Sequence, residues 1–128
     1  MGEVTGGPAI DPAALQAVVE MIGADEPAVI VDLIDTFLMD SAKQVEAMGQ
    51  SLAAGDIKTL HRAAHSMKSS SATFGAMQLS RLCFDLEQSA RADCANGLCA
   101  SEVELITAEH RRVVTALEQE RVSYAARV

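Results

Sequence analysis

A histidine and a lysine lie three residues apart near the middle of the chain, at His65 and Lys68. Residues three apart on a helix are neighbours, so the imidazole and the ammonium group would lie side by side. A neutral imidazole is a competent nucleophile near neutral pH without a separate general base. A phosphoryl group transferred to the imidazole would bring negative charge, which the lysine could stabilise. The pair is compatible with a nucleophilic histidine that has electrostatic support, although the spacing alone favours a histidine at the solvent edge without a role.

The sequence around this pair is poor in carboxylates, because residues 57 to 84 contain no Asp or Glu. We therefore expect no acidic group to repel an incoming phosphoryl group or to pair with Lys68. His61 lies one helical turn before His65, and Ser69 lies one turn after it, so both would flank the imidazole. We expect the histidine at the border of the buried face, where another protein can reach it.

Apolar residues at helical spacing predict one short helix followed by four longer ones. Acidic N-cap residues, prolines and glycines mark most of the helix ends. Ser101-Glu102-Val103-Glu104 fits a capping box, with Ser101 as the cap of the last helix. The expected helices run from Asp11-Pro12 to Gly23, from Asp25-Glu26-Pro27 to Gly55, from Asp56 to Phe74, from Ala76 to a loop near Asp93, and from Ser101 to about Arg121.

The connections between these helices are short, and no strand-like alternation or internal repeat is evident. Short connections favour antiparallel neighbours, so we predict an all-α fold, an antiparallel up-and-down four-helix bundle with a short additional N-terminal helix. The length of 128 residues suits one domain, and the 49% of apolar residues allow a packed core. We expect a flexible segment at residues 1–10, the bundle at 11–121 and a frayed tail at 122–128.

The net charge of −8 argues against nucleic acid or an anionic membrane as a partner. No apolar run approaches the roughly 20 residues needed to cross a bilayer. The start of the chain also lacks a basic segment followed by an apolar one, so no secretory signal is visible. We expect a cytoplasmic protein. The apolar stripes have ordinary widths and leave no surplus face, so we also expect a monomer.

The chain has three cysteines. Cys83 falls on an apolar helical face and is most simply a small buried hydrophobe. Cys94 and Cys99 flank a turn at Asn96-Gly97 and could form a disulfide, although two free thiols in a reducing cytosol is the favoured interpretation. No second pair of cysteines exists to complete a zinc site.

The stretch from Ala64 to Ala76 resembles the central motif of histidine-containing phosphotransfer (HPt) domains. These domains pass a phosphoryl group between aspartates of receiver domains through one histidine. The matching residues are Ala64, His65, Lys68, Ser70, Gly75 and Ala76. The resemblance extends to Asp32–Leu38 and Ala54-Gly55-Asp56 upstream and to Leu79–Glu87 downstream. It implies that His65 accepts the phosphoryl group through Nε2 and that Lys68 stabilises it.

The chain departs from the HPt pattern at Ser69, where the family usually has glycine. Glycine leaves room beside the imidazole, whereas a serine hydroxyl could bind the phosphoryl oxygens or crowd the partner. We expect a modest change in rate or partner choice. Ala72 is a further expected phosphoryl-adjacent position. Glu87 lies where some family members place an amide that supports the site, and a solvated surface acid is an equally favoured interpretation.

The resemblance implies a histidine phosphocarrier of a two-component phosphorelay, which accepts a phosphoryl group from one receiver and passes it to another. The expected partners are response-regulator receiver domains, with a hybrid histidine kinase as one source of the phosphoryl group. We expect no cofactor on this chain, with Mg²⁺ held by the receiver. The chain lacks a Gly-x-x-x-x-Gly-Lys loop and the glycine-rich ATP-binding segments of histidine kinases, so we expect no autonomous kinase activity.

Two other functions compete with this hypothesis. His61 and His65 are four residues apart, a spacing that can place two imidazoles on one metal ion. However, no Glu follows His61 and no acidic residue lies nearby, and His110 on an apolar stripe is better explained as a hydrogen-bonded core histidine. The stronger competitor is a non-catalytic helical module that docks receivers without transferring a phosphoryl group.

Overall fold

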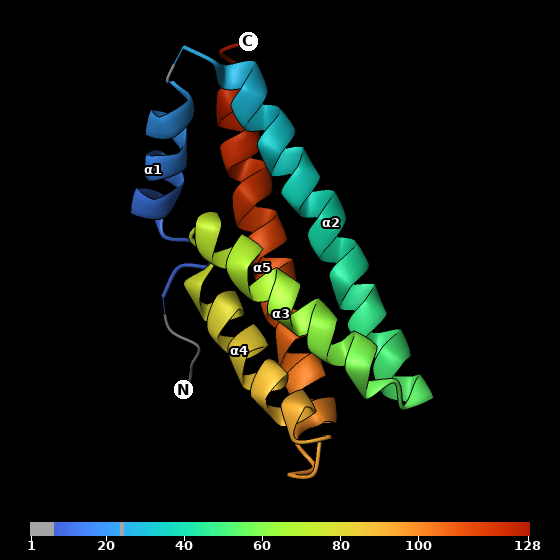
Figure 1. Cartoon of the computed structure of the whole chain (residues 1–128). Coiled ribbons are helices and arrows are strands. Elements are labelled where there is room, and N and C mark those ends of the chain that lie inside the picture. The colour runs from blue at the N-terminus through green and yellow to red at the C-terminus, as the bar shows by residue number, and fades with distance from the viewer. Residues whose placement is uncertain (1–6, 24) are drawn as a thin grey trace.

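The computed structural model describes residues 7–23 and 25–128. Throughout these residues the regular secondary structure is helical, without strands, which confirms the predicted all-α class. The helices are α1 (Pro12–Ile22), α2 (Pro27–Ala54), α3 (Ile57–Thr73), α4 (Met77–Arg91) and α5 (Cys99–Ala125) (Figure 1). In the described part of the chain, no helix combines the length and the apolar character needed to cross a membrane.

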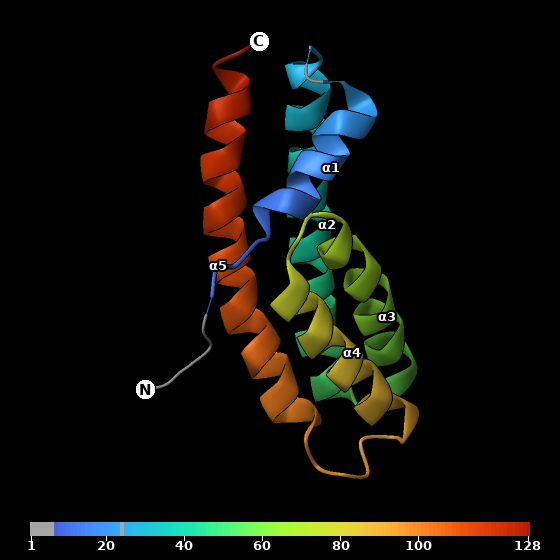
Figure 2. The same cartoon turned by 90° about the vertical axis from the view of Figure 1, so that its left-hand side faces the viewer.

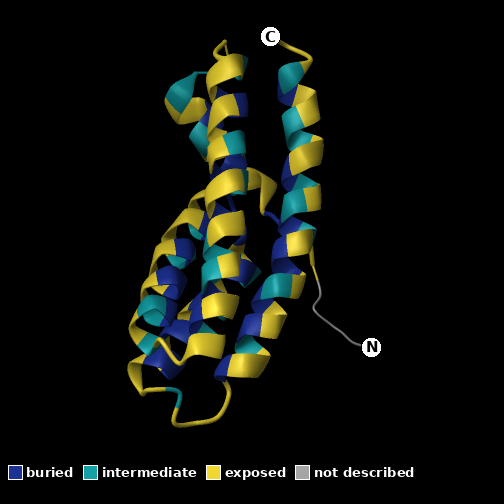
Figure 3. Ribbon diagram, turned by 90° about the vertical axis from the view of Figure 1, so that its right-hand side faces the viewer, coloured by how far each residue is buried: buried dark blue, intermediate teal, exposed yellow. Residues whose placement is uncertain are grey.

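The four long helices pack side by side in a closed ring. Each of them contacts its neighbour in the chain, and α2 contacts α5 to complete the ring. Successive helices run in opposite directions (Figure 1), and the buried positions lie on the faces turned toward neighbouring helices (Figure 3). The short helix α1 packs against α2 and α3 at one end of the molecule (Figure 2). This packing fixes α3 and α4 side by side along their length.

Side chains and glycines end the helices largely as the sequence predicts. Asp11 caps α1, because its Oδ1 accepts a hydrogen bond of 3.0 Å from the Ala13 amide. Asp56 caps α3 in the same way, with an accepted bond of 3.1 Å from the Thr59 amide. Gly55, in the left-handed conformation, ends α2. These residues satisfy amides and carbonyls that the helix itself leaves unpaired.

The predicted capping box at Ser101 is wrong. Helix α5 begins two residues earlier, at Cys99, with Leu98 in the N-cap position. Ser101 lies inside the first turn, where its hydroxyl donates to the Leu98 carbonyl at 2.9 Å. The preceding turn sets the early start, because Asn96 Oδ1 accepts a bond of 3.0 Å from the Leu98 amide.

Both ends of the described chain pack against the core. Ala9 and Ile10, predicted to lie in a flexible segment, are buried in the core; residues 1–6 of that segment lie outside the described residues. The tail predicted to fray from Val122 continues as helix to Ala125. Tyr124 explains this order, because its side chain is buried against the core.

The structure joins Cys94 and Cys99 in a disulfide, so the favoured interpretation of two free thiols is wrong. The turn between α4 and α5 brings the two Cα atoms to 5.7 Å, within the usual range for a disulfide. Cys83 is a free, fully buried cysteine, as predicted. Burial, together with the nearby charge of Glu87, raises the pKa of the Cys83 thiol to about 12, so this thiol stays protonated and unreactive.

Gly75 is required where the turn between α3 and α4 meets the start of α1. Its φ of +78° lies in the left-handed region, and a Cβ there would lie 2.6 Å from the Asp11 carbonyl oxygen. That oxygen cannot move away easily, because the Asp11 amide donates to the Gly75 carbonyl at 2.7 Å. A side chain at this position would therefore separate α1 from the turn.

We predict that Gly75→Ala lowers the free energy of unfolding by about 2–4 kcal/mol, through backbone strain and the clash with Asp11. Gly55→Ala is the matched control, because Gly55 has a similar φ of +72° but a Cβ added there would meet nothing within 4 Å. It should cost only about 1 kcal/mol. Urea denaturation measures both values, and equal losses would contradict the role of the Asp11 contact.

Candidate functional site

Two side chains of α3 meet one carboxylate of α4. His65 Nδ1 lies 2.5 Å from Glu87 Oε2, and Lys68 Nζ donates to Glu87 Oε1 at 2.7 Å. An ionised carboxylate only accepts hydrogen bonds, so Nδ1 must carry the proton of the neutral imidazole. The His65 Nε2 atom is therefore left with a free lone pair. The carboxylate thus holds the ring in the tautomer and orientation of a nucleophile.

The two partners of this hydrogen bond differ sharply in exposure. The His65 side chain is 62% exposed, whereas the Glu87 side chain is only 2% exposed. Burial alone would raise the pKa of Glu87, but hydrogen bonds from Lys68 and His65, with the charges of these groups, outweigh burial and lower it. Glu87 is therefore ionised at neutral pH. A fixed buried anion supports an imidazole that another protein can reach.

Lys68 is paired, contrary to the prediction that no acidic group would engage it. The prediction considered only nearby residues in the sequence, whereas Glu87 comes from the next helix, 19 residues away. The same contact shows that the interpretation of Glu87 as a solvated surface acid is wrong. The Lys68 side chain remains 30% exposed, and its Nζ lies 5.5 Å from the centroid of the Phe84 ring. Lys68 is thus held in place while part of it stays accessible.

The other predicted site residues flank this cluster. The His61 ring is nearly parallel to that of His65, with centroids 6.3 Å apart, and its Nε2 lies 3.9 Å from Glu87 Oε2. Ser69 is exposed one turn beyond His65, and Ala72 is half-buried. No group of three or more His, Cys, Asp or Glu side chains that could hold a metal ion occurs among residues 7–23 and 25–128.

Two residues of α4 that contact the site were not predicted from the sequence. Phe84 is partly exposed beside the Lys68 ammonium group. Ser80 donates to the Lys68 carbonyl at 2.8 Å and so joins α4 to the backbone of α3 at this point. Ser80 and Glu87 are seven residues apart, which places both on one face of a helix. This polar pair within the apolar stripe of α4 was the feature of the sequence that could have indicated their contact with the site.

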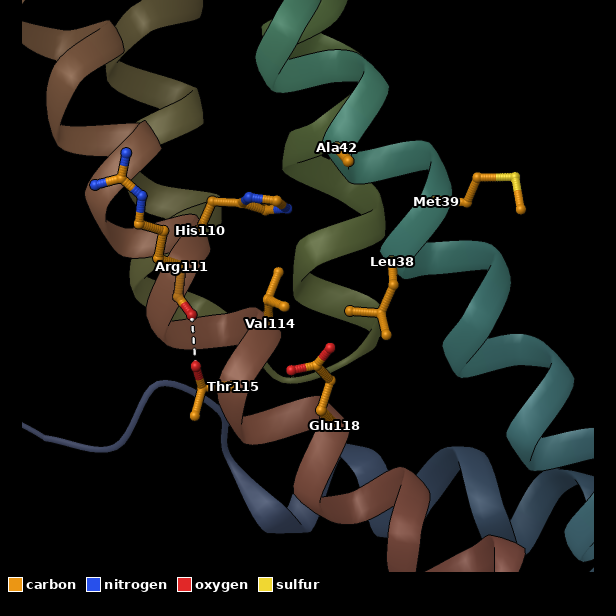
Figure 4. Close-up of a pocket in the computed structure, with 8 residues that line it drawn as sticks. All are labelled: Leu38, Met39, Ala42, His110, Arg111, Val114, Thr115 and Glu118. Carbon is orange, nitrogen blue, oxygen red and sulfur yellow. Dashed lines mark hydrogen bonds between the residues drawn. The ribbon is translucent and has the colours of Figure 1, made fainter.

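His110 lies away from this cluster, in the packing between α2 and α5. Its side chain is buried, and Nε2 lies 2.9 Å from Ser41 Oγ, which confirms the prediction of a hydrogen-bonded core histidine. Burial lowers the pKa of His110, so the ring is neutral in the folded protein near pH 7. The ring borders a groove of about 620 Å³ on this side of the molecule, which Leu38, Met39, Ala42 and Val114 also line (Figure 4).

Comparisons with known proteins show the family to which this fold belongs. The Hpt domain family model matches residues 32–121. The crystal structure of histidine-containing phosphotransfer protein B (HptB) from Pseudomonas aeruginosa PAO1 is similar, with a TM-score of 0.83 and 30% sequence identity. The match covers 93% of this chain and 99% of that chain. No significant match was found among curated proteins. The helical fold and the family match together show that this chain belongs to the Hpt domain family.

Proposed function

We propose that this chain is a histidine phosphocarrier in a two-component phosphorelay. It accepts a phosphoryl group from a receiver-domain aspartate on His65 and passes it to another receiver. The observation that carries the proposal is the exposed His65 side chain, whose Nδ1–H is held by buried Glu87 and whose Nε2 keeps its lone pair. The scaffold is the antiparallel up-and-down four-helix bundle preceded by α1. The carrier acts in the cytoplasm as a monomer.

The proposed transfer needs one nucleophile and no cofactor on this chain. The Nε2 lone pair of His65 attacks the phosphorus of the aspartyl phosphate, and the bond from phosphorus to the aspartate oxygen breaks. The aspartate leaves as a carboxylate, and the imidazole ring gains positive charge. The Nδ1–H bond to Glu87 strengthens as this charge develops. The reverse reaction delivers the phosphoryl group to the next receiver, and each receiver would hold the Mg²⁺ for its own transfer step.

Lys68 serves this reaction without leaving Glu87. An ammonium group has three hydrogens, and Glu87 Oε1 takes one of them. The remaining donors are available to the phosphoryl oxygens on the exposed side of the cluster. The buried carboxylate therefore fixes the position of the lysine in advance, so that no reorganisation is needed when negative charge arrives.

The proposed partner surface lies over the exposed face of α3. Phe84 of α4 is partly exposed next to Lys68 and offers an apolar contact at the edge of the site. Met21 of α1 and Val29 and Leu33 of α2 are also exposed apolar residues, and we propose that they contact the docked receiver. We expect receiver domains of response regulators, and a hybrid histidine kinase as one source of the phosphoryl group.

A transfer assay with a panel of receiver domains tests the proposal. Each receiver is phosphorylated with a radioactive label and mixed with this chain and Mg²⁺. We expect the label to move to the chain from at least one receiver and to show the acid lability and base stability of a phosphoimidazole. A label stable in acid, or none from any receiver that binds, would contradict the phosphocarrier function.

We predict that Ser69→Gly changes the transfer rate by less than about tenfold. Ser69 is exposed, one turn beyond His65, so its hydroxyl can meet the docking partner but does not hold the imidazole. The measurement compares transfer rates of the wild type and the variant with the same receivers. Ser70→Gly, which changes the neighbouring exposed serine, serves as the control. A gain of several orders of magnitude would show instead that the serine is inhibitory.

A further inference from the structure

The connection between α4 and α5 carries a disulfide that takes no part in the contacts of His65, Lys68 and Glu87. This loop, residues 92–98, projects from the end of the molecule (Figure 2). Cys94 is half-buried in a loop whose other residues are exposed, whereas Cys99, the first residue of α5, is only 3% exposed. An external thiol can therefore reach the sulfur of Cys94 more readily than the sulfur of Cys99.

The buried sulfur lies where a thiolate is stabilised. Cys99 opens a helix of 27 residues, and no side chain caps that helix at Leu98. The first amides of α5 therefore lack helical partners, and the positive end of the helix dipole faces this turn. Thiolates at helix N-termini are stabilised, and a stabilised thiolate is a better leaving group in thiol–disulfide exchange. An attack on the Cys94 sulfur would therefore release the Cys99 thiolate at the helix N-terminus, where it is stabilised.

One feature of the oxidised form opposes its stability. One turn after Cys99, the Oε1 atom of Glu102 is buried without a hydrogen-bond partner. Residues three apart on a helix are neighbours, so a Cys99 thiol can supply the donor that the disulfide cannot. Reduction would therefore satisfy a buried acceptor.

We propose that Cys94 and Cys99 form a reversible redox clasp, opened by a dithiol reductant. The reductant's thiolate attacks Cys94 Sγ, and the Cys94–Cys99 bond breaks with Cys99 leaving as a thiolate. The second thiol of the reductant then displaces Cys94. Two electrons and two protons pass to the protein, which gains two thiols, and the reductant becomes a disulfide. The opened clasp frees the first turn of α5. This proposal does not depend on the phosphocarrier function.

Alkylation of the folded protein tests the clasp. The air-oxidised chain is treated with dithiothreitol without denaturant, then with N-ethylmaleimide, and the mass is measured. We expect two labels after reduction and none before it, since Cys83 is fully buried with a pKa of about 12. Reduction should proceed at a rate within a factor of about 100 of that in the urea-unfolded chain. Oxidised dithiothreitol should then restore the unlabelled form.

The effect on the helix gives an independent readout. Reduction should lower Tm by about 5 °C and increase hydrogen exchange of the Glu102 amide, which donates to the Leu98 carbonyl at 2.9 Å, at least about tenfold. The double variant Cys94→Ser/Cys99→Ser is the control and should show the reduced behaviour with or without dithiothreitol. Labels in the air-oxidised chain, or native reduction more than about 100-fold slower than in urea, would overturn the proposal. Unchanged exchange after reduction would also overturn it.

Discussion

Replacing His65 with glutamine should lower the rate of phosphoryl transfer from a receiver domain by at least about 1,000-fold. The glutamine amide has no nucleophilic lone pair to replace Nε2, but it can still donate a hydrogen bond to Glu87. The fold should remain intact, with a stability change of about 1 kcal/mol or less, because the His65 side chain is 62% exposed. Single-turnover transfer from a labelled receiver measures the rate, and urea denaturation measures the stability.

His61→Gln is the matched control for this experiment. It makes the same substitution one helical turn away, at a ring that stacks with His65 and lies 3.9 Å from Glu87. We expect at least about a tenth of the wild-type rate to remain. A His65→Gln protein that still became labelled would place the phosphoryl group on another residue. A variant without label that kept full biological activity would instead favour the docking module.

The sequence predicted the helices well because their determinants are local. Asp11 and Asp56 cap helices through amides two or three residues away, and Gly55 ends α2 by its own conformation. The exception at Ser101 has a physical cause of the same kind. The turn at Asn96 precedes Ser101 in the chain and starts α5 at Cys99. Ser101 therefore lies inside the helix, and the predicted capping box does not form.

The candidate site was predicted only in part, because its electrostatics are not local. His65 and Lys68 could be paired by their spacing on one helix, whereas Glu87 reaches them from α4, across 22 and 19 residues. No spacing rule assigns such a partner before the packing of α3 on α4 is known. The same limit applies to Cys94 and Cys99, whose pairing depends on two residues with left-handed φ angles in the connecting loop.

Glu87→Ala should lower both stability and transfer. The substitution leaves a buried space and removes the partner of Lys68 and His65, at a cost of about 2 kcal/mol. The cost stays below that of a fully buried ion pair, because Lys68 is 30% exposed and can turn to solvent. Transfer should fall by about 10- to 100-fold, since the imidazole loses the group that selects its tautomer and orientation. Urea denaturation and single-turnover transfer measure the two effects.

Glu87→Gln separates the two roles of the carboxylate. The amide oxygen can still accept from His65 Nδ1, whereas the ion pair that positions Lys68 is lost, so transfer should fall by less than about tenfold. The pKa of Glu87 is lowered in the folded protein, so the unfolded chain binds the proton more readily. The contribution of Glu87 to stability is therefore present above about pH 4.3, the ordinary pKa of glutamate, and is lost as the pH falls through the lower folded value.

The glutamine variant should accordingly lose this part of the acid dependence of unfolding, and nitrogen NMR should still show the proton of His65 on Nδ1. In Glu87→Ala the proton should be shared between Nδ1 and Nε2, because neither nitrogen then has a fixed acceptor. Equal transfer rates in the two variants would contradict this role of Glu87, since they differ in whether an oxygen faces Nδ1. The reactivity of His65 would then depend on its exposure alone, and buried Glu87 would serve the packing of α3 against α4.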